Sequence, residues 1–243
     1  MQQLVSIVMP AYNAEAFIAK AIASVLNQEH ENWELIIVND GSSDGTAEVV
    51  ARHSDPRIRY YALPENKGIG TARNKGLDEA RGEFLCTLDA DDFMPPRSLS
   101  SRIAALDTSP GNDIVDGRVR FMDLSMERTL KEYLPRFEGE PLDELLALTG
   151  SCFMGCSWMI RWSPSNKLRF NTDLSHGEDL LFYIGYAKGK RYIAVDEEVR
   201  LADALLSGEV GLGGDVAVLA EGLHPLLGGA FLHAKEHLVA GVL

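Results

Sequence analysis

The chain has 243 residues, a formal net charge of −13, and a composition that is 46% hydrophobic and 24% charged. Such a length fits one large domain or two closely packed halves, and such a composition excludes a largely disordered chain. The negative charge argues against direct binding to nucleic acid or to an anionic membrane surface, because like charges repel.

Cysteine usage and hydropathy bear on where the protein works. Cys86, Cys152 and Cys156 lack a paired C-x-x-C spacing, so we expect buried free thiols in a reducing compartment. No signal peptide precedes the first apolar run, and the sequence contains no uninterrupted apolar stretch of about 18 residues. These features predict a cytoplasmic protein, either free or attached peripherally to the inner face of the membrane.

Short apolar runs alternate with helical patterns through the first half of the chain. Strands are predicted at residues 4–9, 33–38, 58–62 and 83–88. Helices are predicted at 17–26, at 46–53, around Arg73, and after Pro95-Pro96. This alternation predicts an α/β fold whose Rossmann-like central sheet is mostly parallel and flanked by helices.

Polar loops follow three of these strands, at the edge of the sheet where open α/β folds bind their ligands. The loops are Pro10 to Asn13, Asp40 to Asp44, and Asp89 to Asp92, and Arg73 joins them from the third helix. The acids of the last loop repel one another unless a cation lies between them, and carboxylate oxygens suit magnesium or manganese. The residues thus predict a divalent metal that holds a phosphate-bearing ligand.

The strand–helix alternation stops near Asp107, which divides the chain into residues 1–107 and residues 108–200. In the second part we predict strands at 113–122, 153–160 and 191–195, and helices at 142–148 and 180–187. Gly177-Glu178-Asp179 lies at the start of the last helix. Residues 201–243 form an atypical tail rich in Gly, Ala and Leu, in which Lys235 is the only Lys or Arg.

Four segments, residues 8–13, 38–46, 66–74 and 88–92, resemble the family 2 glycosyltransferases of GT-A fold in their order and spacing. Gly177-Glu178-Asp179 is similar to the later acidic motif of that family. The resemblance covers about residues 4–199. It implies a GT-A domain in which residues 1–107 bind a nucleotide sugar and residues 108–200 bind the acceptor.

The resemblance implies a nucleotide diphosphate sugar as donor, most often a UDP-sugar. It assigns the following residues to that donor: Pro10, Tyr12, Asn13, Asp40, Arg73, Asp89 and Ala90. Within this set, Asn13 would support its loop and Asp89 would lie near the ribose. Asp91, together with Asp89, would form the DXD motif that holds Mn²⁺ or Mg²⁺ between the two phosphates.

The resemblance also implies inverting transfer to the hydroxyl of a saccharide or lipid-linked acceptor, in polysaccharide or glycolipid synthesis. Asp179 would be the general base, Glu178 a supporting or acceptor-facing residue, and Trp158 a residue on the acceptor side. One base suffices if a metal absorbs the charge of the departing diphosphate. Position at a helix start favours the ionised carboxylate that a base requires.

Other interpretations stand beside these. Asp44 is better explained as a turn and helix cap, and Trp158 equally well as a core residue. Gly68-Ile69-Gly70 is a weak match to a nicotinamide-binding loop, because Arg73 stands where a third glycine belongs. The pattern H-x-x-E-H at His233 to His237 resembles an inverted zinc-protease motif, but so short a match arises easily by chance.

The tail departs from the family, whose members commonly carry a Tyr/Arg/His-rich segment that helps to close over the diphosphate. It could pack as helices, serve homodimerisation or membrane contact, or arise from an altered reading frame. Its composition motivates an alternative function, a non-catalytic nucleotide-sugar-binding protein. A nucleotidyltransferase is a second alternative, although Pro10 to Asn13 lacks the basic, glycine-rich character expected of its first loop.

Overall fold

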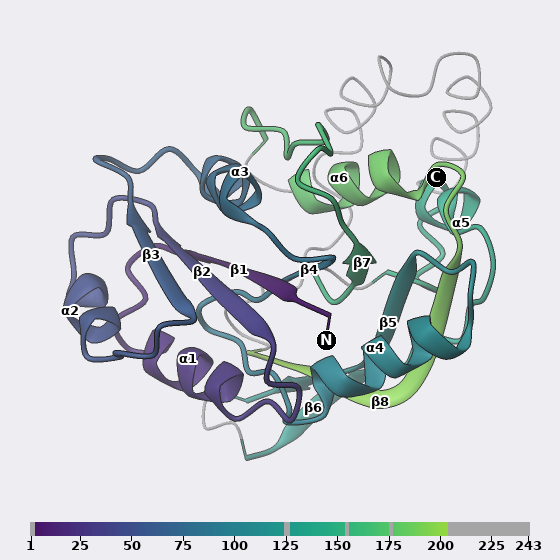
Figure 1. Ribbon diagram of the computed structural model, residues 1–243, viewed down its shortest axis with the longest axis horizontal. Coiled ribbons are helices and arrows are strands. Elements are labelled where there is room, and N and C mark those ends of the chain that lie inside the picture. Colours follow the sequence, from purple (N-terminus) through teal and green to yellow (C-terminus); the bar gives the residue numbers. More distant parts are fainter. Residues whose placement is uncertain (1–2, 124–126, 154–155, 175–176, 204–243) are drawn as a thin grey trace.

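The computed structural model of the protein describes residues 3–123, 127–153, 156–174 and 177–203. Figure 1 shows one twisted sheet with helices on both sides. In chain order the elements are β1 (Val5–Ala11), α1 (Ile18–Leu26), β2 (Trp33–Asn39), α2 (Thr46–Ala51), β3 (Ile58–Ala62), α3 (Ile69–Glu79), β4 (Phe84–Thr87), α4 (Ser98–Thr108), β5 (Ile114–Met122), β6 (Thr129–Tyr133), α5 (Leu142–Leu146), β7 (Met159–Arg161), α6 (Glu178–Ala187) and β8 (Tyr192–Asp203).

The strands form one sheet in the order β3-β2-β1-β4-β7-β5-β6, and β8 also pairs with β5. Strands β1 to β4 are mutually parallel, as are β5 and β8, whereas β7 runs antiparallel to both β4 and β5. The predicted α/β class with a mostly parallel sheet is confirmed. The carboxyl ends of β1, β2 and β4 therefore lie at the same edge, where the three polar loops begin.

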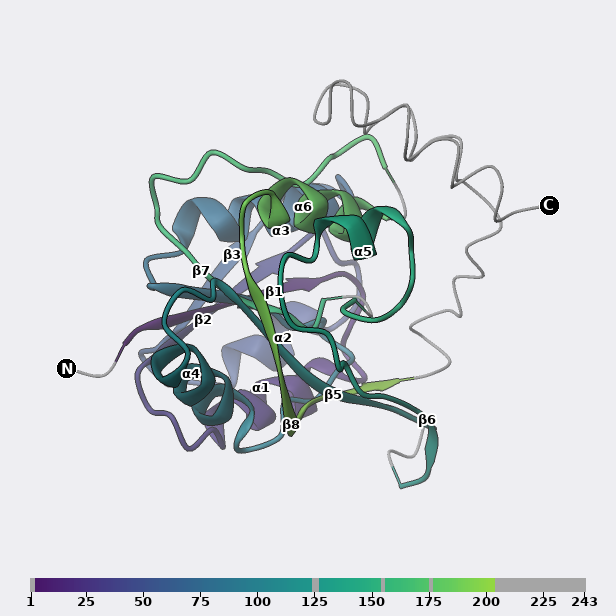
Figure 2. The same cartoon turned by 90° about the vertical axis from the view of Figure 1, so that its right-hand side faces the viewer.

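Strands β1, β2 and β4 are buried on both faces, which explains their largely apolar sequences, whereas β3 lies at the edge of the sheet and is partly exposed. In β2, Ile36 and Val38 face the core under α3, α5 and α6, whereas Leu35 and Ile37 face the core under α1, α2 and α4. Figure 2 shows these two helical layers above and below the sheet. The period of two in a strand thus divides one hydrophobic run between two cores.

Three predictions for the second half need correction. The strand expected at 153–160 is confined to Met159–Arg161, and the final strand continues eight residues past its expected end at Val195, to Asp203. Strand β6 was not predicted, because four of its five residues are exposed and its sequence lacks an apolar alternation. None of the helices among the described residues is long and apolar enough to cross a membrane.

Candidate functional site: an ion-pair network at the edge of the sheet

The loops after β1 and β2 are joined by Asn13. Its backbone N–H donates to Ser42 Oγ at 2.9 Å, and its side-chain Oδ1 accepts the N–H of Ser43 at 2.9 Å. Asn13 adopts a positive φ of 48°, a conformation that asparagine tolerates better than most residues. The neighbouring Tyr12 is 52% exposed, so its ring is available at the rim of the site.

Asp40 fixes the turn that leads into α3. Its Oδ1 accepts the backbone N–H of Lys67 at 2.9 Å, and its Oδ2 accepts that of Gly68 at 2.8 Å. The side chain is buried, and each oxygen retains a second lone pair for a further donor. In this structure Asp40 therefore supports the loop before Arg73, and contact with a nucleotide base stays a prediction.

Asp44 caps the start of α2. One oxygen accepts the backbone N–H of Thr46 at 3.0 Å, and the other accepts that of Glu15 at 3.0 Å. These bonds satisfy backbone donors at a turn and at a helix start. The capping interpretation of Asp44 agrees with this geometry.

Arg73 lies at the centre of the site, on α3, with only 3% of its surface exposed. Its Nη2 donates to Asp89 Oδ1 at 3.0 Å, and its Nη1 donates to Glu178 Oε1 at 2.5 Å. Burial by itself lowers the pKa of a guanidinium, but the acidic groups around Arg73 raise its pKa well above the ordinary value. Arg73 is therefore a permanent buried cation that joins the acidic loop to α6.

Arg200, on β8, binds the same acidic loop from the other side. It donates to Asp89 Oδ2 at 2.9 Å and forms an ion pair with Asp92. The backbones of Leu201 and Phe93 exchange two hydrogen bonds, of 2.8 and 2.9 Å, beside it. Sequence reasoning missed Arg200, because the strand that carries it was expected to end at Val195 and a single arginine after three acids carries no motif signal.

The two arginines separate the three acids of the loop into different environments. Burial by itself raises the pKa of Asp89, but Arg73 and Arg200 outweigh it and lower that pKa below its ordinary value. Burial, together with the charges of Asp89 and Asp91, raises the pKa of Asp92 above its ordinary value despite Arg200. Asp91 itself is half-buried, between the buried Ala90 and Asp92.

The described residues contain no group of three His, Cys, Asp or Glu side chains that could enclose a metal ion. The acidic loop still fits one kind of metal binding. Mg²⁺ and similar ions commonly take one or two protein carboxylates and complete their coordination with phosphates and water. Both oxygens of Asp89 accept from arginines, and the assignment of a metal ligand within this loop stays a prediction.

Asp179 lies in the first turn of α6, one residue after Glu178. Gly177 precedes the helix in a left-handed conformation with φ of 75°, which glycine adopts without strain. One carboxylate oxygen of Asp179 accepts the N–H of Leu180 at 2.7 Å, and the other lies 3.7 Å from Cys156 Sγ. The half-buried Asp179 is thus brought to the site by the Glu178–Arg73 ion pair, from more than a hundred residues away in sequence.

Two acceptor-side expectations do not agree with the structure. Trp158 is fully buried, its indole N–H donates to Cys152 O at 2.7 Å, and its ring packs 4.8 Å from that of Tyr183. Glu178 is 5% exposed and bound to Arg73, so it does not present its carboxylate to an acceptor. Trp158 is therefore a core residue here, and Glu178 supports the network.

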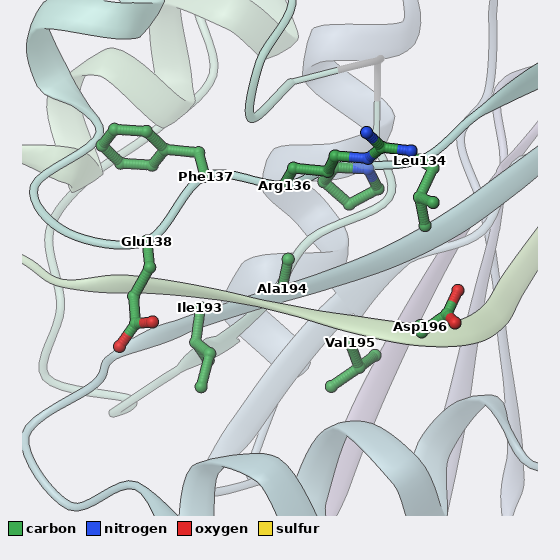
Figure 3. A pocket seen from close by; sticks show the side chains of 9 residues that line it. Leu134, Arg136, Phe137, Glu138, Ile193, Ala194, Val195 and Asp196 are labelled. Carbon is green, nitrogen blue, oxygen red and sulfur yellow. The ribbon is translucent and has the colours of Figure 1, made fainter.

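A separate hollow of about 330 Å³ lies between β8 and the segment that follows β6. Figure 3 shows Arg136 and Phe137 on one side of it and Ile193 to Asp196 on the other. None of the predicted donor, metal or base residues lines this hollow. It therefore does not mark the candidate site.

Comparison with known proteins supports the family resemblance. A model of glycosyl transferase family 2 matches residues 6–169. An uncharacterized glycosyltransferase of Haemophilus influenzae is 32% identical over 189 residues, which cover 76% of this chain and 72% of the relative. WfgD of Escherichia coli, a UDP-Glc:alpha-D-GlcNAc-diphosphoundecaprenol beta-1,3-glucosyltransferase, is 44% identical over 103 residues, 42% of this chain and 41% of the relative.

Among solved structures, TarS residues 1–349 of S. aureus in complex with UDP-GlcNAc superimposes with a TM-score of 0.73 at 20% identity. The match covers 98% of this chain and 70% of that one, and it supports the GT-A fold. The family model spans more than half of the chain, including the loops after β1, β2 and β4. The chain therefore belongs to glycosyl transferase family 2 and is a glycosyltransferase.

Proposed function

We propose that this glycosyltransferase is metal-dependent and inverting, and that it moves a sugar from a UDP-sugar to a hydroxyl of a saccharide or lipid-linked acceptor. The observation that carries the proposal is the network Glu178–Arg73–Asp89, which brings the acidic loop and the helix of Asp179 to one site. The names of WfgD and of the TarS complex support a UDP-sugar donor, and that of WfgD supports a lipid-linked acceptor.

In this proposal the first half of the chain binds the donor. The exposed ring of Tyr12 packs against the base, with Pro10 and Asp40 beside it, and Asp89 accepts from the ribose. Asp91 holds the metal, Mn²⁺ or Mg²⁺, which when bound neutralises the charge that develops on the departing diphosphate. Its half-buried carboxylate supports this role, because a fully buried one would be out of reach.

The second half of the chain binds the acceptor and supplies the base. Asp179 takes the proton from the acceptor hydroxyl as its oxygen attacks the anomeric carbon, on the face opposite the leaving diphosphate. It lies in the first turn of α6, where one of its oxygens accepts the N–H of Leu180. The three free cysteines of the described residues fit a reducing compartment, and we place the enzyme in the cytoplasm, near the inner face of the membrane.

Two substitutions test whether Asp91 binds the metal and whether Asp179 acts as the base. Asp91→Ala should weaken Mn²⁺-dependent binding of UDP at least tenfold, or about 1.4 kcal/mol, in calorimetric titration. Asp179→Asn should keep that binding and lower turnover about 10²- to 10⁴-fold, followed as release of UDP from a UDP-sugar in the presence of an acceptor panel. The first variant removes a ligand, whereas the second removes only a proton acceptor.

Matched controls separate these effects from general loss of charge. Asp143→Asn changes the second residue of α5, the counterpart of Asp179 in α6, and Asp173→Ala removes an exposed loop acid. Both should behave as the wild type. Normal turnover by Asp179→Asn would refute the base assignment. Tight metal-dependent binding without any UDP release, in the unmodified protein, would favour a non-catalytic binding protein, the interpretation motivated by the composition of residues 201–243.

A further inference from the structure

Glu178 connects the base-bearing helix to the donor half of the molecule. It is the first residue of α6, and its Oε1 lies 2.5 Å from Nη1 of Arg73 on α3. Both side chains are nearly inaccessible, at 6% and 3% exposure, so water screens this ion pair little. Figure 1 shows α3 and α6 on the same face of the sheet, and the ion pair joins these two helices.

Arg73 connects Glu178 to the proposed donor site. Its second nitrogen, Nη2, binds Asp89 at 3.0 Å, so the guanidinium is held between one carboxylate from each half of the chain. Removing one partner of a buried ion pair leaves the other charge uncompensated, which is far more costly than losing an exposed pair. A change at Glu178 is therefore expected to move or reorient Arg73, and with it the carboxylate of Asp89.

Helix α3 also contacts the second half of the chain through the side chain of Asn74 and through a close backbone approach at Gly70. The side chain of Asn74 donates to Phe170 O at 2.9 Å and accepts the N–H of Phe170 at 2.8 Å. A Cβ added at Gly70 would lie 2.6 Å from Asn171 O, so this contact requires glycine. The position of α3, which carries Arg73, therefore depends on Phe170 and Asn171, in the segment that precedes α6.

From these contacts we propose that Glu178 is a positioning residue of the donor site. It acts through Arg73 on the position of the Asp89 carboxylate, and it thereby fixes the donor site relative to the helix that carries Asp179. The inference rests on the proposed function, because it assumes that Asp89 and Arg73 bind the nucleotide. Of the two roles expected for Glu178, supporting and acceptor-facing, it favours the supporting one. Its consequence is that an acid of the acceptor half controls nucleotide affinity even when acceptor is absent.

The test is the affinity for UDP, measured by calorimetry with Mn²⁺ and without acceptor, in the full-length protein. Glu178→Gln keeps the shape of the side chain and removes its charge, and we expect it to raise the Kd for UDP about tenfold. Glu178→Asp keeps the charge but shortens the reach, and its Kd should lie between those of the wild type and Glu178→Gln. The KM for the acceptor, measured at saturating donor, should change little in either variant.

Asp78→Asn is the matched control. Asp78 also lies on α3 and also pairs with the second half, through Arg169 Nη2 at 2.6 Å, but that pair is exposed and does not contact the acidic loop. Its removal should leave the Kd for UDP unchanged. The thermal unfolding midpoint of each variant should be measured, and the titrations should be run well below the lowest midpoint. These measurements separate a local effect on binding from partial unfolding.

An unchanged Kd for UDP in Glu178→Gln, with a raised KM for the acceptor, would overturn the inference and return Glu178 to an acceptor contact. An equal rise in Asp78→Asn would overturn it as well, because the effect would then be general loosening of α3. If Glu178→Gln melts below the assay temperature, Glu178→Asp carries the test with the same outcomes. Failure of the wild type to bind UDP would instead refute the proposed function itself.

Discussion

Asp89 illustrates how the environment of a single carboxylate decides its role. The motif alone suggested that Asp89 and Asp91 share a metal, but each oxygen of Asp89 binds a different arginine, Arg73 or Arg200. Both arginines lower the pKa of Asp89 and so keep it ionised. An ionised, immobilised acid suits recognition of a sugar hydroxyl, the role proposed for Asp89.

Asp116, a buried acid on β5, should make stability depend on pH. Burial raises its pKa to about 6, from an ordinary value of 3.8, although Gly117 N–H donates to it at 2.8 Å. Between these values the folded protein holds a proton that the unfolded chain has lost. The free energy of unfolding should therefore fall as the pH rises from about 4 to 6, with a total change of about 1 to 3 kcal/mol from this group.

Asp116→Asn should remove that dependence, because asparagine does not titrate. Relative to the wild type, the variant should gain about 1 to 3 kcal/mol between pH 4 and pH 7, measured by urea unfolding at several pH values. Asp107→Asn, at an exposed position, serves as the control and should leave the pH profile unchanged. A parallel profile for Asp116→Asn and the wild type would show that Asp116 ionises normally in the folded protein.

At the scale of elements, sequence periodicity predicted the first half well and the second half less well. Strand β8 continues through Asp196, Glu197 and Glu198, a run that looked like its end. Its backbone pairs with the neighbouring β5 before this run and again from Glu198, and Arg118 and Arg120 of β5 form ion pairs with Asp196 and Glu198. Opposite charges on adjacent strands stabilise a pairing that neither strand reveals in its own sequence.

Two helical glycines, Gly70 and Gly185, should respond differently to alanine. A Cβ at Gly70 of α3 would meet the backbone oxygen of Asn171 at 2.6 Å, whereas one at Gly185 of α6 would meet the flexible end of Leu168 at 2.9 Å. Gly70→Ala should destabilise the protein by about 1 to 3 kcal/mol, because the backbone must shift. Gly185→Ala should cost less, since a rotamer change relieves the contact and alanine favours a helix.

Chemical unfolding of both variants checks this difference, and UDP titration adds a second measure. The Gly70→Ala shift would displace α3, so the Kd for UDP should rise in that variant and stay constant in Gly185→Ala. Equal stability losses for the two substitutions would mean that α3 is free to move away from Asn171.

At the scale of the whole molecule, the two predicted parts share one sheet. Strands β7, β5 and β8 follow the boundary near Asp107, yet they extend the sheet directly from β4. The carboxylates of Asp89 and Glu178 then meet on Arg73 across that boundary. We therefore propose that residues 1–107 and 108–200 are functional halves of one cooperative domain. Residues 204–243, including the H-x-x-E-H pattern, lie outside the described residues.

The reactivity of the Cys86 thiol tests whether the two halves unfold together. It lies in β4 at the centre of the sheet, 2% exposed, and burial raises the pKa of its thiol. Its alkylation by iodoacetamide should be slow in the folded protein and should accelerate with urea in parallel with global unfolding. Mass spectrometry of the peptide that contains Cys86 measures this rate. Fast labelling that is insensitive to urea would indicate that the halves separate locally.

The sequence by itself determined the α/β class, the strands of the first half, the loops at their carboxyl ends and the family, because local periodicity and motif spacing encode these features. Only the tertiary structure decided that Trp158 is core, that Glu178 binds Arg73, and that Arg200 reaches Asp89. Those outcomes depend on which residues distant in the chain become neighbours. A buried charge adopts the partner that the packing provides, and sequence spacing does not reveal that partner.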